Sequence, residues 1–143
     1  MGYFLILIRL PLIVIHIVLG LIILIFFPTN NLKLKPLHHK ISQMWMKILS
    51  LLFGFNVIQL GSLDNSADIF ISNHITLFDI IILQSIVPVN FVAKSEIKNW
   101  PIIGHLSSKT GTIFINRGDV SDNKEVINTI KKYIQLNKKV VIF

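Results

Sequence analysis

His74 and Asp79 are the residues whose types and spacing best suit chemistry, five positions apart in the segment Asn73-His74-Ile75-Thr76-Leu77-Phe78-Asp79. An imidazole that a carboxylate holds in one tautomer can take a proton from an alcohol through its other ring nitrogen. On a regular helix this spacing separates two side chains by about 140°, so they meet only if His74 lies in the turn before the helix. The spacing alone is common, and a structural histidine near a helix start is the ordinary alternative.

The residues around this pair predict the turn that it needs. Asp68 to Ser72 is a short apolar run that predicts a buried strand, and Thr76 to Ile86, closed by Pro88, predicts a helix. The start of that helix would also offer backbone amides to an anion. Ser72 lacks the Gly-x-Ser-x-Gly elbow of a serine hydrolase.

Strands and helices are predicted to alternate along the rest of the chain. A helix starts at the capping-box pair Asp122 and Glu125, and Ser95 to Leu106 is irregular or helical with a break at Pro101. Three further strands are predicted, at 90–93, 112–115 and 140–143. This order favours an α/β fold around a largely parallel sheet.

Four more residues are candidates for the neighbourhood of the site. Lys94 ends a predicted strand, where ligands of open α/β sheets bind, so it is a candidate phosphate contact, with a plain surface lysine as the alternative. Gly111 predicts a tight turn or a close backbone approach, and Phe114 and Ile115 are expected to pack the sheet. His105 has no acidic partner at a useful spacing and is expected to be incidental.

The N-terminal 30 residues are predicted to be a hydrophobic membrane segment. Leu10 to Phe27 is apolar apart from His16, and such a run is just long enough for a hydrocarbon core of about 30 Å. A re-entrant or interfacial segment is the second interpretation. A cleaved signal peptide is the third, although no small-x-small cleavage site follows.

Residues 31–60 are predicted to be a basic flank and an interfacial helix, the helix running from Leu37 to Phe55. The lysines after the apolar segment outnumber the single Arg9 before it, which places the C-terminal part on the cytoplasmic side of an inner membrane. His38 and His39 are interpreted as part of the solvated flank. Trp45 is either a headgroup anchor or core packing.

Composition limits the function classes. The formal charge is +7, 52% of the residues are hydrophobic, and the mean hydropathy is +0.68. This balance suits an anionic membrane surface or a phosphorylated substrate. Nucleic-acid binding is not expected, because the lysines are dispersed without interleaved aromatic residues. The absence of cysteine excludes disulfides, thiolate metal sites and a cysteine nucleophile.

Three blocks in register resemble the glycerolipid acyltransferases, the enzymes that acylate lysophosphatidic acid. The Asn-His-x4-Asp block from Asn73 resembles their first motif. Lys94-Ser95-Glu96-Ile97 with Trp100-Pro101-Ile102-Ile103-Gly104 is similar to the segment that follows, and Gly111-Thr112-Ile113-Phe114-Ile115-Asn116-Arg117 is similar to their Gly-x-Ile-Phe-Ile-x-Arg block. The resemblance runs from about Asp68 to the last residue.

The resemblance implies an αβα domain, over residues 61–143, that transfers an acyl group from acyl-CoA or acyl-carrier protein to 1-acyl-sn-glycerol-3-phosphate. Glycerol-3-phosphate or another lysolipid is the alternative acceptor. His74 would be the general base, Asp79 would orient it, and Arg117 would grip the substrate phosphate. Gly111, Phe114 and Ile115 belong to the same substrate-binding block. No metal and no organic cofactor are implied; the expected partners are membrane lipids, the lysophospholipid and the acyl donor.

The family's third motif, Phe-Pro-Glu-Gly-Thr, would begin at Phe143. We therefore expect a chain truncated at its C-terminus, with an incomplete pocket. A membrane-bound fragment without turnover is the alternative to an enzyme.

Overall fold

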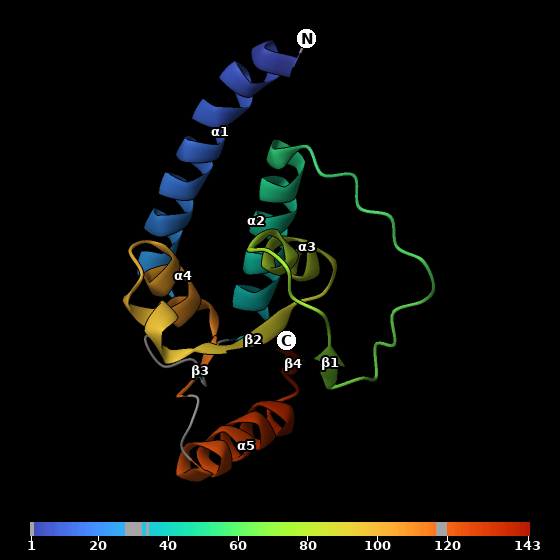
Figure 1. Cartoon of the computed structure of the whole chain (residues 1–143), viewed down its shortest axis with the longest axis vertical. Coiled ribbons are helices and arrows are strands. Elements are labelled where there is room, and N and C mark those ends of the chain that lie inside the picture. Colours follow the sequence, from blue (N-terminus) through green and yellow to red (C-terminus); the bar gives the residue numbers. More distant parts are fainter. Residues whose placement is uncertain (1, 28–32, 34, 117–119) are drawn as a thin grey trace.

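A four-stranded sheet forms the centre of the protein in a computed structural model that describes residues 2–27, 33, 35–116 and 120–143 (Figure 1). Its spatial order is β1 (Ile69–Ile71), β4 (Lys139–Ile142), β2 (Val89–Lys94) and β3 (Ile113–Ile115). Every pairing in it is parallel, so the carboxyl ends of the strands share one edge. The α/β fold with a largely parallel sheet is confirmed.

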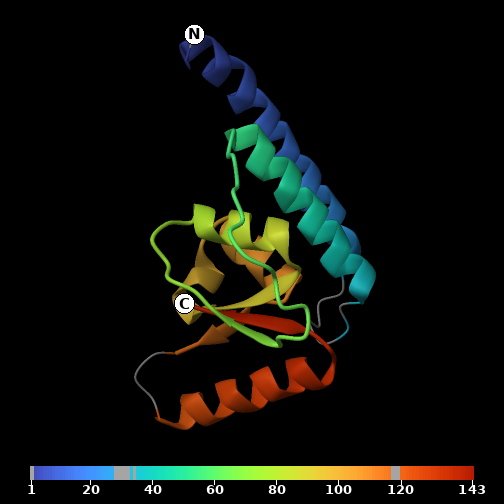
Figure 2. The same ribbon diagram turned by 90° about the vertical axis from the view of Figure 1, so that its right-hand side faces the viewer.

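Helices cover both faces of the sheet and give three layers (Figure 2). The helices α3 (Phe78–Ile86) and α4 (Ile103–Thr110) lie on one face, and α5 (Val120–Gln135) lies on the other. Successive side chains of β4 point to opposite faces of the sheet. Val141 packs with the α3 side and Val140 with the α5 side, as expected for a strand buried on both faces.

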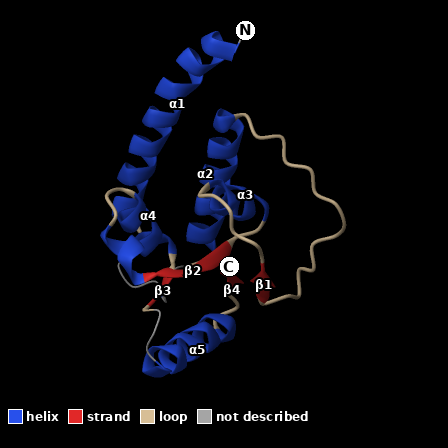
Figure 3. Ribbon diagram, in the orientation of Figure 1, coloured by secondary structure: helices blue, strands red, loops and turns tan. Residues whose placement is uncertain are grey.

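The predicted elements are present, with shifts at their ends (Figure 3). The segment after β2 divides at Pro101 as predicted, into a 3-10 helix, η3 (Ser95–Asn99), and α4. α5 begins at Val120, so the prediction that Asp122 starts this helix is wrong. An acidic residue is favoured inside the first turn of a helix as well as at its cap, and the sequence pattern does not separate the two positions.

The N-terminal helix α1 (Gly2–Ile23) continues into a short 3-10 helix, η1 (Leu24–Phe26). Within it, Ile6–Phe26 is long and apolar enough to cross a membrane, by length and composition. Most of its large apolar side chains are exposed, which indicates membrane association.

The second helix, α2 (Pro36–Phe53), runs back beside α1 (Figure 1). The rings of His16 and Trp45 stack with their centroids 4.8 Å apart. His16 Nε2 donates to the Trp45 carbonyl oxygen at 3.0 Å, and Trp45 Nε1 donates to the His16 carbonyl oxygen at 3.3 Å. Gly20 makes room for the indole, because a Cβ there would lie 2.6 Å from Trp45 Cε2. Trp45 therefore packs between two helices.

α2 also packs on the α/β domain, where Gln43 Nε2 donates to the carbonyl oxygen of Ile86 at the end of α3, at 2.8 Å. The interfacial position of α2 stays a prediction. The solvated flank predicted for the histidine pair is wrong for His39, which is half-buried. Burial, with help from Lys138, lowers the pKa of His39 to about 4. The prediction missed this because β4 brings Lys138 to α2 from the far end of the chain.

Gly104 lies where α4 crosses η3. A Cβ on Gly104 would meet the carbonyl oxygens of Lys98 and Ile97, the latter at 2.8 Å. We expect Gly104→Ala to lower the free energy of unfolding by about 1–3 kcal/mol, because backbone atoms cannot move aside as a flexible side chain can. Thermal unfolding in detergent measures the change. His105→Ala, the exposed neighbour, is the control, and equal stability of the two variants would contradict the close approach.

Candidate active site

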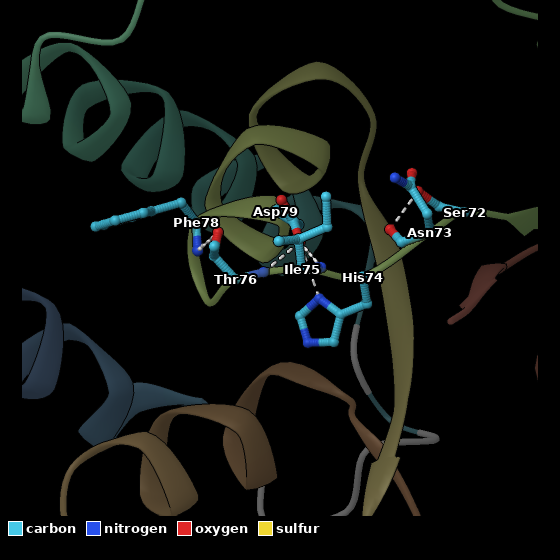
Figure 4. Close-up of polar contacts among 7 residues, drawn as sticks. All are labelled: Ser72, Asn73, His74, Ile75, Thr76, Phe78 and Asp79. Atoms are coloured by element: carbon cyan, nitrogen blue, oxygen red, sulfur yellow. Dashed lines mark hydrogen bonds and ion pairs between the residues drawn. The ribbon is translucent and has the colours of Figure 1, made fainter.

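The side chains of His74 and Asp79 are in contact at the carboxyl edge of the sheet, where the chain leaves β1 for α3 (Figure 4). His74 Nδ1 lies 3.0 Å from Asp79 Oδ2. A carboxylate only accepts, so Nδ1 carries the hydrogen and donates it. The other nitrogen, Nε2, is left to act on a bound molecule. The side chain of His74 is 41% exposed, which leaves it accessible.

The turn before α3 holds the Asp79 carboxylate in place. The backbone amides of Ile75 and Thr76 donate to Asp79 Oδ2, at 2.7 and 2.8 Å, so three donors converge on one oxygen (Figure 4). The Phe78 amide donates to Thr76 Oγ1 at 3.2 Å, and the Asp79 amide donates to the Thr76 carbonyl oxygen. Because His74 lies in this turn and not on the helix, its side chain can meet that of Asp79, which a five-residue spacing on a regular helix would prevent.

These bonds use four of the amides at the helix start. The sequence suggests that the helix start offers its amides to an anion, but the amides of Ile75, Thr76, Phe78 and Asp79 already donate within the turn.

The same bonds lower the pKa of the Asp79 carboxyl. The amides of Thr76 and Ile75 are the largest causes; desolvation opposes them, and the hydrogen bond and charge of His74 make smaller contributions that lower the pKa further. The carboxylate is therefore ionised at neutral pH and available to stabilise a protonated His74.

This pKa predicts a pH dependence. A lowered folded-state pKa contributes stability above the pKa of the unfolded chain, and this contribution is lost as the pH falls through the folded-state value, below about 4. The Asp79 carboxyl carbon should titrate, by NMR, with a midpoint below the ordinary aspartate value. The midpoint should stay low in His74→Ala, because the two amides are the larger cause. A midpoint at or above the ordinary value would contradict the hydrogen-bond pattern.

Phe143 is a site neighbour whose contact the sequence interpretation missed. Its ring stacks on the imidazole of His74, with centroids 4.2 Å apart and planes 20° apart, and it also stacks with the ring of Phe91, with centroids 5.7 Å apart. The parallel order of the strands was the available signal, because β4 pairs with β1 and the ends of both reach the same edge. The aromatic ring limits the directions from which a molecule reaches His74.

The other predicted residues lie at varying distances from the pair along this edge. Lys94 ends β2 and is exposed, and it pairs in register with Ile115 of β3. Lys94 and His74 follow different strands at the same edge of the sheet. Their strands, β2 and β1, are not neighbours, because β4 lies between them. Gly111 ends α4 with a φ of 96°, in keeping with the predicted turn. Phe114 lies half-buried in β3, and Arg117 lies outside the described residues.

Other catalytic arrangements find little support in the described part of the chain. No group of three or more His, Asp or Glu side chains is placed there to hold a metal ion. Ser72 Oγ donates to the Asn73 carbonyl oxygen at 3.0 Å (Figure 4).

Known proteins with similar sequences carry acyl-transfer names. A lyso-ornithine lipid O-acyltransferase of Rhizobium meliloti is 34% identical over 78% of this chain and 38% of its own length. One of Pseudomonas aeruginosa is 28% identical over 76% of this chain and 42% of its own length. A 1-acyl-sn-glycerol-3-phosphate acyltransferase of Helicobacter pylori is 32% identical over 89% of this chain and 54% of its own length. The chain thus spans about 40–55% of the length of these relatives.

No solved structure matches the chain significantly. The model of the acyltransferase family matches residues 55–143, more than half of the chain, and this stretch contains β1, the His74–Asp79 turn and the whole sheet. Because this model matches more than half of the chain, and because relatives are 34% and 32% identical over most of the chain, this chain belongs to the acyltransferase family.

Proposed function

We propose that His74 is the general base of an O-acyl transfer to the free hydroxyl of a lysolipid. The observation that carries the proposal is the 3.0 Å contact between His74 Nδ1 and Asp79 Oδ2, which fixes one tautomer and leaves Nε2 as the proton acceptor. Family membership supports the reaction type.

In the proposed reaction, His74 Nε2 takes the proton of the hydroxyl as its oxygen attacks the carbonyl carbon of the acyl thioester. Asp79 stays ionised and stabilises the imidazolium. The tetrahedral intermediate then collapses, the carbon–sulfur bond breaks, and His74 returns the proton to the leaving thiolate. The products are the acylated lipid and the free thiol of coenzyme A or acyl-carrier protein.

We take 1-acyl-sn-glycerol-3-phosphate as the acceptor, which would make the product phosphatidic acid. The name of the Helicobacter pylori relative supports this choice. A phosphate-bearing acceptor also suits Lys94 on the same edge of the sheet, and Arg117 as a second cation. Lyso-ornithine lipid is the second candidate, because two of the relatives described above carry that name.

One assay tests the proposal and separates the two acceptors. Membranes that contain the chain are supplied with labelled acyl-CoA or acyl-carrier protein and either 1-acyl-sn-glycerol-3-phosphate or lyso-ornithine lipid. Labelled phosphatidic acid above the level of membranes without the chain is the expected result. Turnover with lyso-ornithine lipid alone would favour the second candidate, and turnover with neither acceptor would refute catalysis by this chain.

We further propose that α1, with α2 beside it, holds the α/β domain on the cytoplasmic face of the inner membrane. The apolar surface of α1 and the exposed cations Lys33, Lys35 and Lys40 after it support this orientation. A lysolipid in that leaflet would then reach His74 without leaving the bilayer completely.

A further inference from the structure

A groove of about 670 Å³ lies between α2, the extended segment that follows it and the end of α3. Its volume is within the usual range of small-molecule sites. On α3 it is lined by Ser85 and Ile86, in the last turn, whereas Asp79 lies in the first turn. Seven helical residues separate the two positions by about 10 Å. This end of the groove is therefore remote from the candidate active site, whereas the opposite end reaches the start of α3, where the rings of Phe55 and Phe78 lie 5.1 Å apart.

The lining of the groove is polarised along α2. Lys40 and Lys47 stand seven residues apart, two helical turns, so they share one face of the helix. Both lysines are exposed, and neither forms an ion pair with a described residue. None of the lining residues, all of which are described, is acidic. This half of the groove is thus a concentration of uncompensated positive charge.

The other half combines three large apolar side chains with the amides of Asn56 and Gln59. Leu51 from the last turns of α2 and Phe55 and Val57 from the following segment line it. The chain then continues with Ile58 and Leu60, which are 75% and 91% exposed. Large aliphatic side chains exposed beside a membrane-associated helix favour contact with acyl chains over contact with water.

We infer that this groove binds an anionic phospholipid of the bilayer. The headgroup phosphate lies between Lys40 and Lys47, and one acyl chain follows Leu51, Phe55 and Val57. Charge and apolar surface are arranged as in such a molecule, and α2 packs directly on the apolar helix α1. Headgroup attraction to lysines near a membrane surface is the expected driving force.

The lipid in this groove is a resident molecule and not the acyl acceptor. Its phosphate lies beside Ser85 and Ile86, about one length of α3 from the turn that holds His74. A glycerol hydroxyl next to that phosphate cannot also reach His74 Nε2. Binding would instead fix the depth and orientation of the α/β domain against an anionic leaflet.

Native mass spectrometry tests the inference. The chain is released from lipid nanodiscs that contain equal amounts of phosphatidylglycerol and phosphatidylcholine. We expect the wild type to retain one phosphatidylglycerol, and Lys40→Gln/Lys47→Gln to retain about tenfold less. Lys131→Gln/Lys132→Gln is the matched control, because both residues are exposed on α5, which covers the opposite face of the sheet (Figure 2).

Each outcome decides the inference. Equal retention by the wild type and Lys40→Gln/Lys47→Gln, equal losses in both double variants, or equal retention of phosphatidylcholine would overturn it. Displacement by inorganic phosphate at matched concentration would also overturn it, because the acyl chain would then contribute nothing. Lys40→Arg/Lys47→Arg should retain the lipid and guards against loss through misfolding. Retention does not depend on turnover, so its failure is distinct from failure of the proposed acyl transfer.

Discussion

His74→Ala is expected to reduce acyl transfer by roughly 10²–10⁴-fold, the usual contribution of a general base. The loss should fall on kcat, because the imidazole acts on the hydroxyl proton in the transition state and contributes little to holding the lipid in the ground state. Initial rates on membranes, at saturating acceptor and donor, measure it.

The chain supplies a matched control in His105, an exposed histidine of α4 outside the candidate site. His105→Ala should keep wild-type turnover. Similar losses in both variants, or wild-type turnover in His74→Ala, would remove His74 from the role of base. The membrane level of each variant, measured by blotting, separates a catalytic loss from a loss of protein.

Asp79→Asn is expected to reduce turnover nearly as much, by roughly 10²–10³-fold, although the side chain keeps its size. The amide carries no charge to stabilise the imidazolium. An asparagine oxygen in the place of Oδ2 can still accept from His74 Nδ1 and from the Ile75 and Thr76 amides, because all three donors converge on that one atom. His74 would therefore keep its tautomer but lose the negative charge that stabilises its protonated form.

Asp64→Asn is the control for this change, since Asp64 also accepts hydrogen bonds from a nearby residue, Ser66, but lies in the loop before β1. It should leave turnover unchanged. The outcome that contradicts a role for the Asp79 charge is an Asp79→Asn variant that folds, shown by an unchanged circular dichroism spectrum, and retains at least half of the wild-type kcat.

The features that the sequence predicted well are set by neighbouring residues. The contact between His74 and Asp79, the strand before it and the helix after it lie within a short segment, and their patterns are visible there. The alternation of strands and helices likewise predicted the parallel sheet, because parallel strands need crossover connections. The family resemblance added a possible role for Arg117, and the position of Lys94 at the end of a strand added one for that residue; both remain predictions.

The features that it missed depend on contacts between distant parts of the chain. The pKa of His39 depends in part on the charge of Lys138, and the stack on His74 is made by Phe143. The sequence left open whether Trp45 packs in the core or anchors to headgroups, and its stack on His16 decides for packing. Local patterns do not specify such pairs. The hydrogen bonds from the Ile75 and Thr76 amides were missed for another reason. The sequence interpretation gave the Asp79 carboxylate one partner, the His74 imidazole, whereas it also accepts from these two amides.

The turn from His74 to Asp79 contains both members of the candidate pair and the two amides that hold the carboxylate, all within six consecutive residues. The hydrogen bonds that orient the pair are therefore local to one short peptide, whereas the ring of Phe143 reaches His74 from the end of β4. In the proposed reaction, the unit that transfers the proton would thus be separate from the loops that select the acceptor, so a change in those loops would alter the lipid used without altering the base.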